Sequence, residues 1–231
     1  MARILLMSSS FDLPTKYISS LTDILEGEAR GMGHEVQHLK DYGLTPESYA
    51  YAVESFRPDI VIGSGHGGPN VFTSMDVSPL IVGCTNDGLL AGSGVVFLSC
   101  LTGQALAPSI IRKGGRAVAA FTSEFTWIVS DPYNPSTDPY WAPFQRMLLE
   151  STREVLRGNG WGAWYSTLQR VGREEVARWG QSTDPQASDI VYALMHDLGC
   201  ATVVGEGAGA SAGGESPGLL ALIPLAALLL G

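Results

Sequence analysis

The chain has few cysteines, few charged residues and no run of basic residues. Its three cysteines, Cys84, Cys100 and Cys200, show no C-x-x-C spacing among 231 residues. They are too few and too scattered to form a disulfide framework or a cysteine zinc cluster. Only 16% of the residues are charged, and the formal net charge is −9. This balance argues against nucleic-acid binding, because neutralising phosphates requires clustered lysines and arginines.

The N-terminus lacks the long apolar run of an export signal. Its apolar stretch, Ile4–Met7, is only four residues long, whereas a secretory core needs roughly 7–15. We therefore expect a first buried strand and a protein made in the cytoplasm without export.

The C-terminal part of the sequence changes in composition after residue 204. Residues 205–217 are mostly glycine, alanine and serine, which is typical of a flexible linker. The last 14 residues, 218–231, carry no charge. As a helix they would span about 21 Å, which is short of the roughly 30 Å of a bilayer core. Two interpretations stay open for this tail: membrane association, or docking on the domain or on a partner.

Residues 1–204 alternate apolar runs with helical patterns, which predicts an α/β domain with a mostly parallel sheet of about six strands and helices on both faces. The predicted strands are 2–8, 34–40, 59–64, 94–99, 116–121 and 201–204, with a short one near 78–83. The predicted helices are 16–31, 45–56, 104–113, 140–157, 162–179 and 187–198.

A glycine-rich loop follows the third predicted strand, in the stretch D-I-V-I-G-S-G-H-G-G-P-N of residues 59–70. Gly63, Gly65 and Gly68 match the G-x-G-x-x-G pattern of dinucleotide-binding loops. That site also requires a helix to begin at the loop, but P-N-V-F-T follows here and predicts a turn and an extended segment. Nucleotide binding by a flavodoxin-like domain is therefore a weaker functional hypothesis than the two that are given below, a cysteine peptidase and a scaffold module.

Residues 34–38 read H-E-V-Q-H, which matches the H-E-x-x-H motif of zinc peptidases. That motif needs both histidines on one helical face. Glycines at 31 and 33 instead favour a loop that enters a strand, where His34 and His38 would lie about 13 Å apart. We expect two structural histidines, and no metal site.

His66 and Cys100 form the strongest candidate pair. Each follows an apolar strand, and the carboxyl ends of parallel strands meet at one edge of the sheet, where open α/β sheets bind ligands. A cysteine beside a histidine can act as a nucleophile with its base. Cys84 is the rival nucleophile, but no comparably strong strand and helix surround it.

The two motifs around this pair, D-I-V-I-G-S-G-H-G-G and G-V-V-F-L-S-C-L-T-G, resemble those of the caspase-like cysteine peptidases of clan CD. The short interval between histidine and cysteine is most similar to the gingipain-type (C25) branch and to the caspase-like domains fused to TPR repeats. The later stretch G-G-R-A-V-A-A-F-T-S-E-F-T-W agrees, and the resemblance covers residues 59–169. It implies a three-layer fold of the caspase/flavodoxin type.

The resemblance implies a role for each matching residue. His66 would be the general base and acid, Cys100 the nucleophile, and the backbone N–H groups of Gly67 and Cys100 the oxyanion hole. The helix expected to begin at Thr102-Gly103 would favour the thiolate through its N-terminal dipole. The substrate pocket would lie in segment 122–131, with these residues in it: Ser123, Glu124, Trp127 and Asp131.

The expected activity is that of a cysteine endopeptidase, which cleaves a peptide or protein substrate through an acyl-enzyme without a metal or cofactor. The alternative is a catalytically idle scaffold module tethered by its tail. Leu98 stands where clostripain-like members carry an acid, so a preference for basic P1 residues is not indicated. The group that orients His66 is left open between a backbone carbonyl and Asn70.

Overall fold

The computed structural model describes residues 1–130 and 134–208, and within these ranges the strands form one large and one small sheet. The large sheet has the order β2-β1-β3-β7-β8-β9, and only β9 is antiparallel to its neighbour. The prediction of a mostly parallel sheet of about six strands is confirmed. The bounds of these strands are β1 Arg3–Ser8, β2 Glu35–Lys40, β3 Ile60–Ser64, β7 Gly94–Leu98, β8 Ala117–Phe121 and β9 Ala201–Gly205.

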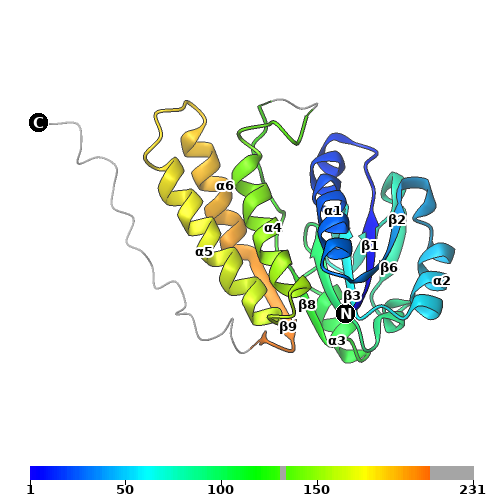
Figure 1. The fold of residues 1–231 in the computed structure, drawn as a ribbon. Helices are drawn as coiled ribbons and strands as arrows, with labels where there is room; N and C mark the ends of the chain where they lie inside the picture. Colours follow the sequence, from blue (N-terminus) through cyan, green and yellow to red (C-terminus); the bar gives the residue numbers. More distant parts are fainter. Residues whose placement is uncertain (131–133, 209–231) are drawn as a thin grey trace, which may run out of the picture.

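Helices cover both faces of this sheet, as predicted. Helices α1, α4, α5 and α6 contribute to the core on one face, and α2 and α3 to the core on the other. Figure 1 shows α4, α5 and α6 side by side next to β8 and β9. The bounds are α1 Leu13–Gly31, α2 Pro46–Phe56, α3 Leu106–Arg112, α4 Ala142–Leu156, α5 Trp161–Trp179 and α6 Ala187–Cys200.

The central strands read as continuous apolar runs because both of their faces are buried. In β1, Ile4 and Leu6 belong to the core under α1, whereas Leu5 and Met7 belong to the core under α2 and α3. Successive strand residues point to opposite faces of a sheet, so a strand between two helix layers needs apolar residues at every position. This burial anchors the strand ends that carry the candidate site.

Helix α1 begins at Leu13, three residues earlier than predicted. Asp12 is its N-cap, and its side chain accepts a hydrogen bond from the backbone N–H of Thr15. The Thr15 hydroxyl accepts a reciprocal bond from the N–H of Asp12, which completes a capping box. Pro14 is tolerated because the first turn of a helix has no use for its missing N–H. The cap places Asp12 at the carboxyl edge of the sheet.

The small sheet consists of β4 Gly67–Gly68, β5 Val71–Thr73 and β6 Pro79–Val82, paired antiparallel in that order. The sequence predicted a strand near β6 but not the sheet itself. Its Phe72 is buried, and its ring would lie 2.9 Å from a Cβ at Gly63. The glycine loop thus continues into a strand and not into a helix, which removes the basis for dinucleotide binding.

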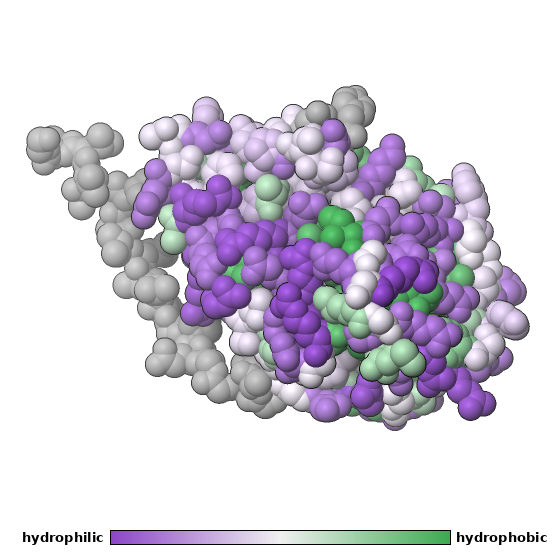
Figure 2. Space-filling model, in the orientation of Figure 1, coloured by the Kyte–Doolittle hydropathy of each residue, from purple (hydrophilic) through white to green (hydrophobic). Residues whose placement is uncertain are grey.

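The surface in the view of Figure 2 is mainly hydrophilic over α4 and α5, and hydrophobic residues form only small separate patches. Within residues 1–130 and 134–208, no helix is long and apolar enough to cross a bilayer. Gly205 ends β9, one residue beyond the predicted domain boundary. The rest of the predicted linker after residue 208, and the whole tail 218–231, lie outside the described residues.

Candidate active site

The sheet brings His66 and Cys100 to matching positions on neighbouring strands. Strands β3 and β7 pair in parallel, and Ser64 lies opposite Leu98. His66 is two residues beyond Ser64, and Cys100 is two residues beyond Leu98. Both residues line one cavity of about 520 Å³.

Gly67 brings the two loops into close contact. A Cβ at this position would lie 2.5 Å from the carbonyl oxygen of Cys100 and 2.7 Å from Cγ2 of Thr102. Real Cβ atoms do not approach backbone oxygens so closely, because the contact is far inside van der Waals range. Only glycine therefore lets the backbone that follows His66 lie against the backbone of Cys100.

The cavity lies between these strand ends, the first turns of α1 and the segment that follows β8. Its surface is largely apolar, and Glu124 is an acidic residue on its border. The residues that line it are Leu13, Pro14, Thr15, Ile18, Gly65, His66, Gly67, Leu98, Ser99, Cys100, Leu101, Glu124, Phe125, Thr126, Trp127 and Val129.

Asp12 is the partner of His66, and sequence reasoning missed it. The distance between His66 Nε2 and Asp12 Oδ2 is 2.7 Å. The sequence left this partner open between a backbone carbonyl and Asn70. Asn70 is excluded because it donates from Nδ2 to the carbonyl of Gly83, and the group at Nε2 is a side-chain carboxylate. The stretch D-L-P-T of residues 12–15 carries the signal of an N-cap, but its place beside His66 follows only from the sheet order β1-β3.

The carboxylate of Asp12 has a lowered pKa, and this favours its charged form. Burial acts to raise this pKa, but hydrogen bonds from Thr15 and His66 outweigh it. Because a carboxylate only accepts hydrogen bonds, the bond to Asp12 places the hydrogen of a neutral His66 ring on Nε2. The other nitrogen, Nδ1, then holds the lone pair that a base requires.

Cys100 is a thiol that needs a base. Burial raises its pKa, although the N–H of Phe125 donates to its Sγ at 3.4 Å, and Glu124 and Asp197 raise the pKa further. The expectation that a helix dipole at Thr102-Gly103 favours the thiolate was wrong, because α3 begins only at Leu106. The turn between Cys100 and α3 separates the N-terminus of the helix from Sγ of Cys100, and the effect of a helix dipole falls off within one turn.

The backbone directly after Cys100 is strained. Leu101 has φ 62°, in the left-handed region that residues other than glycine and asparagine rarely adopt. Its N–H donates to the carbonyl of Ser123 at 3.0 Å, which holds the turn in place. Such conformations cost about 1–3 kcal/mol and persist where the surroundings enforce them, often at functional sites.

The predicted substrate-pocket residues are only partly brought together. Glu124 and Trp127 line the cavity. Ser123 is not among the lining residues, since its carbonyl binds Leu101 on the side of the turn. Asp131 lies outside the described residues. The first turns of α1 form a further wall of the cavity. This wall was not predicted, because no local motif in the sequence indicates it.

The other two cysteines do not line the cavity that holds His66. Cys84 is exposed, and its Sγ lies 3.4 Å from the hydroxyl of Ser109 on α3. Cys200 is buried, and burial raises its pKa to about 12. Among the described residues that line the cavity, Cys100 supplies the sulfur.

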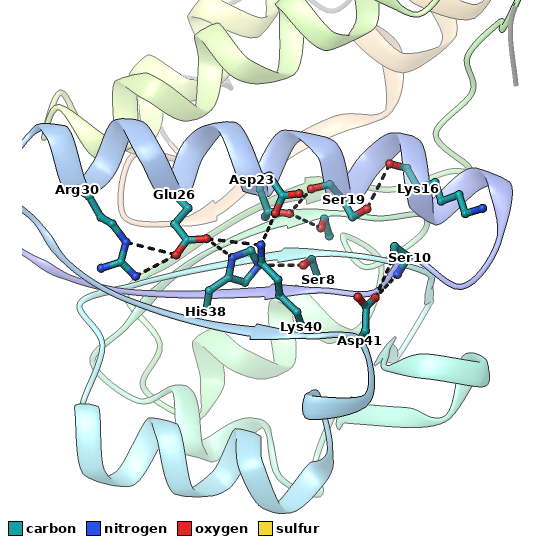
Figure 3. Close-up of polar contacts among 12 residues, drawn as sticks. Ser8, Ser10, Lys16, Ser19, Asp23, Glu26, Arg30, His38, Lys40 and Asp41 are labelled. Carbon is teal, nitrogen blue, oxygen red and sulfur yellow. Dashed lines mark hydrogen bonds and ion pairs between the residues drawn. The ribbon is translucent and has the colours of Figure 1, made fainter. Parts of the chain in front are cut away.

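The histidines of the H-E-x-x-H sequence have structural partners, as expected. His38 lies on β2, as the strand interpretation predicted; its Nδ1 is 2.8 Å from Glu26 and its Nε2 2.8 Å from the hydroxyl of Ser8 (Figure 3). His34 precedes β2, and its two ring nitrogens contact the N–H of Ala2 and the carbonyl of Leu156. The two rings thus serve different networks and share no metal position.

Comparison with known proteins supports the fold and no closer relationship. No family model and no curated protein sequence matches this chain. Among solved structures, the gingipain RgpB from Porphyromonas gingivalis, in the complex of its pro- and mature domains, is similar over 89% of this chain, with 15% identity and a TM-score of 0.57. The chain has a caspase-like fold. It spans 47% of the length of the RgpB chain.

A second similar structure is an inactive zymogen of a C11 protease from Parabacteroides distasonis. It is 13% identical, and the match covers 54% of this chain and 49% of that chain. Its TM-score of 0.38 is too low to carry an argument. At these identities the likeness concerns the fold, so the chemistry of the site rests on its own residues.

Proposed function

We propose that this chain is a cysteine peptidase in which Cys100 is the nucleophile and His66 the general base and acid. One observation carries the proposal: the two residues occupy matching positions beyond paired strands and line one cavity, with the Asp12 carboxylate 2.7 Å from the imidazole. A nucleophile, a base and a group that orients the base form the recurring arrangement for covalent hydrolysis.

In the proposed reaction, Nδ1 of His66 accepts the proton of the Cys100 thiol while Sγ attacks the carbonyl carbon of the scissile peptide. The resulting oxyanion accepts hydrogen bonds from the backbone N–H groups of Gly67 and Cys100; one such donor contributes about 3–4 kcal/mol. The C–N bond then breaks, and His66 gives its proton to the leaving amine. Water hydrolyses the thioester with His66 again as base, which restores the thiol.

The substrate is a peptide or protein whose P1 side chain enters the apolar cavity. Trp127 supplies an aromatic wall, and Glu124 supplies a carboxylate at the border. An extended chain that lies across the strand ends would contact the first turns of α1 on one side and segment 124–129 on the other. The P1 preference is the property that this arrangement most directly determines.

The proposal is tested with a library of fluorogenic peptides that varies P1, assayed on the wild type, Cys100→Ala and Cys84→Ser. We expect hydrolysis by the wild type and Cys84→Ser, and a loss of at least about 1,000-fold in Cys100→Ala. An acyloxymethyl ketone should label the wild type at Cys100 and leave Cys100→Ala unlabelled.

Labelling spread equally over the three cysteines, without hydrolysis of any peptide, would contradict the proposal. It would instead support the alternative of an idle scaffold module. Far-UV circular dichroism of each variant establishes that the comparison is made between folded proteins.

A further inference from the structure

The last turn of α6 lies directly behind the wall of the cavity and is bonded to it. The Nε2 of His196 is 2.8 Å from the carbonyl of Glu124, and the N–H of Thr126 donates to Oδ1 of Asp197 at 2.9 Å. The carbonyl of Cys200 accepts from the N–H of Thr122 at 2.8 Å. Three residues of α6 thus contact alternate positions, 122, 124 and 126, of one segment.

The same three residues hold a cluster of potential metal ligands. One ligand atom each from His196, Asp197 and Cys200 lies within 4.8 Å of the other two. His196 and Cys200 lie about one turn apart on α6, so their side chains lie on the same side of the helix, and Asp197 follows His196 directly. The cluster therefore combines a nitrogen, an oxygen and a sulfur donor in a small volume.

Asp197 is the feature that a purely structural role leaves unexplained. Its side chain is completely buried, and its Oδ2 has no hydrogen-bond partner among the described residues. Buried polar atoms normally have a partner, so this oxygen is available to accept a proton or to bind a cation.

His196 is already oriented as metal ligands usually are. A carbonyl oxygen only accepts, so the bond to Glu124 places the ring hydrogen on Nε2 and leaves the lone pair on Nδ1. Histidines that bind metals typically donate their other N–H to a carbonyl or carboxylate in this way.

We propose that His196, Asp197 and Cys200 bind one Zn²⁺ ion, with water in the fourth position. Zinc accepts nitrogen, oxygen and sulfur donors together, whereas Ca²⁺ and Mg²⁺ require oxygen donors. Ligands around tetrahedral zinc lie about 3.3–3.8 Å apart, so the cluster contracts by about 1 Å on binding. The ion displaces the thiol proton of Cys200 and fills the position beside Oδ2 of Asp197. This site uses neither Cys100 nor His66 as a ligand and does not require that pair to be active, although Asp197 and Cys200 are close enough to Cys100 to act on it electrostatically.

A second cluster shows why the α6 site differs from an ordinary polar group. Asp23, Glu26 and His38 also lie within ligand distance of one another. Figure 3 shows that Lys40 and Arg30 already supply the positive charge there: Lys40 Nζ is 2.6 Å from Asp23 and 3.6 Å from Glu26. The ammonium group already balances the charge of these carboxylates, so this cluster does not call for a metal ion.

The test uses the Cys100→Ala variant after a chelator has removed any bound metal, so that the candidate catalytic thiol does not contribute to metal binding. Zn²⁺ is titrated in competition with a chromophoric chelator, and Co²⁺ is added in parallel as a spectroscopic probe. We expect one equivalent of Zn²⁺ and a sulfur-to-cobalt charge-transfer band. Adding Cys200→Ser should abolish the band and weaken Zn²⁺ binding at least 100-fold; adding His196→Ala should weaken it at least tenfold.

Cys84→Ser and Asp23→Asn, each in the Cys100→Ala background, are the matched controls and should bind as before. Unchanged binding after Cys200→Ser and His196→Ala would overturn the proposal. A wild type that binds zinc while Cys100→Ala does not would also overturn it, because the ion would then sit on the Cys100–His66 pair. His196 is half-buried, so its variant tests the site even if Cys200→Ser fails to fold. None of these readouts depends on peptide hydrolysis, so the two proposals fail independently.

Discussion

Among residues 1–130 and 134–208, two histidine–carboxylate pairs have nearly equal geometry, and one of them lines the cavity of about 520 Å³. His66 is 2.7 Å from Asp12, and His38 is 2.8 Å from Glu26. The side chain of His66 is 31% exposed, whereas that of His38 is 4% exposed. The His66 ring borders a cavity that also contains a thiol.

The His38 pair has a hydroxyl in place of the thiol. The Ser8 Oγ, the His38 ring and the Glu26 carboxylate form a chain of hydrogen bonds like that of a serine hydrolase (Figure 3). Yet Ser8 is buried and does not line the cavity that holds His66 and Cys100. Hydrogen-bond geometry alone therefore does not identify a catalytic group; access to a substrate-sized space must accompany it.

The largest expected difference between the pairs is in activity. His66→Ala removes the base, and we expect kcat/KM for the best peptide to fall about 100- to 10,000-fold. The unfolding midpoint should change little, because the ring is partly exposed. Peptide hydrolysis and urea unfolding measure the two effects. A variant that keeps full activity would remove His66 from the mechanism.

His38→Ala should give the opposite result. It leaves the buried hydroxyl of Ser8 without its imidazole partner, which should cost about 1–3 kcal/mol of stability. The folded variant should retain the labelling rate of Cys100. Urea unfolding and labelling kinetics check the two parts, and a loss of labelling in folded protein would contradict the contrast.

A smaller effect is expected for the carboxylate partner of His66. Asp12→Asn keeps the helix cap, because asparagine caps as well as aspartate, but it removes the charge that orients and stabilises the imidazole. We expect kcat to fall about tenfold with KM unchanged, less than for a fully buried triad aspartate. Circular dichroism should show intact helices. Equal activity in the two proteins would make Asp12 a cap only.

The smallest effect concerns the stability in acid that the buried His38–Glu26 pair provides. Hydrogen bonds from His38 and Arg30 lower the pKa of Glu26 to about 2. The stability that Glu26 contributes is therefore present above 4.5, its pKa in the unfolded chain, and is lost as pH falls from 4.5 toward 2. Burial lowers the pKa of His38, so the folded protein also loses stability through this residue as pH falls below 6.5.

Glu26→Gln should flatten the acid side of the stability curve and cost less than about 1 kcal/mol at pH 7. Urea midpoints at pH 3, 5 and 7 provide the measurement. An unchanged acid slope would show that other carboxylates dominate.

The strands were predictable because each central one is buried on both faces. Gly94–Leu98 and Ala117–Phe121 differ by one residue at one end from their predicted ranges. Their identity as parallel neighbours then followed from the order of strands and helices along the chain, and this order brought His66 and Cys100 together.

The parts that depend on distant contacts were not predictable. The place of Asp12 beside His66 requires knowing that β1 lies next to β3. The small sheet depends on Phe72 packing over Gly63, which no local pattern encodes. Helix α3 begins at Leu106, two residues later than predicted, because the turn that follows the strained Leu101 extends through residues 104 and 105. Local propensity does not report such tertiary demands.

The two oxygens of Asp12 divide two duties that different side chains would normally perform. Oδ1 accepts from Thr15 and starts α1, while Oδ2 accepts from His66. Asparagine, serine and threonine start helices well but carry no charge, and glutamate carries the charge but is not a favoured starting residue. Aspartate alone satisfies both demands, so a saturation screen at position 12 should find no second residue that preserves both folding and the wild-type rate of turnover.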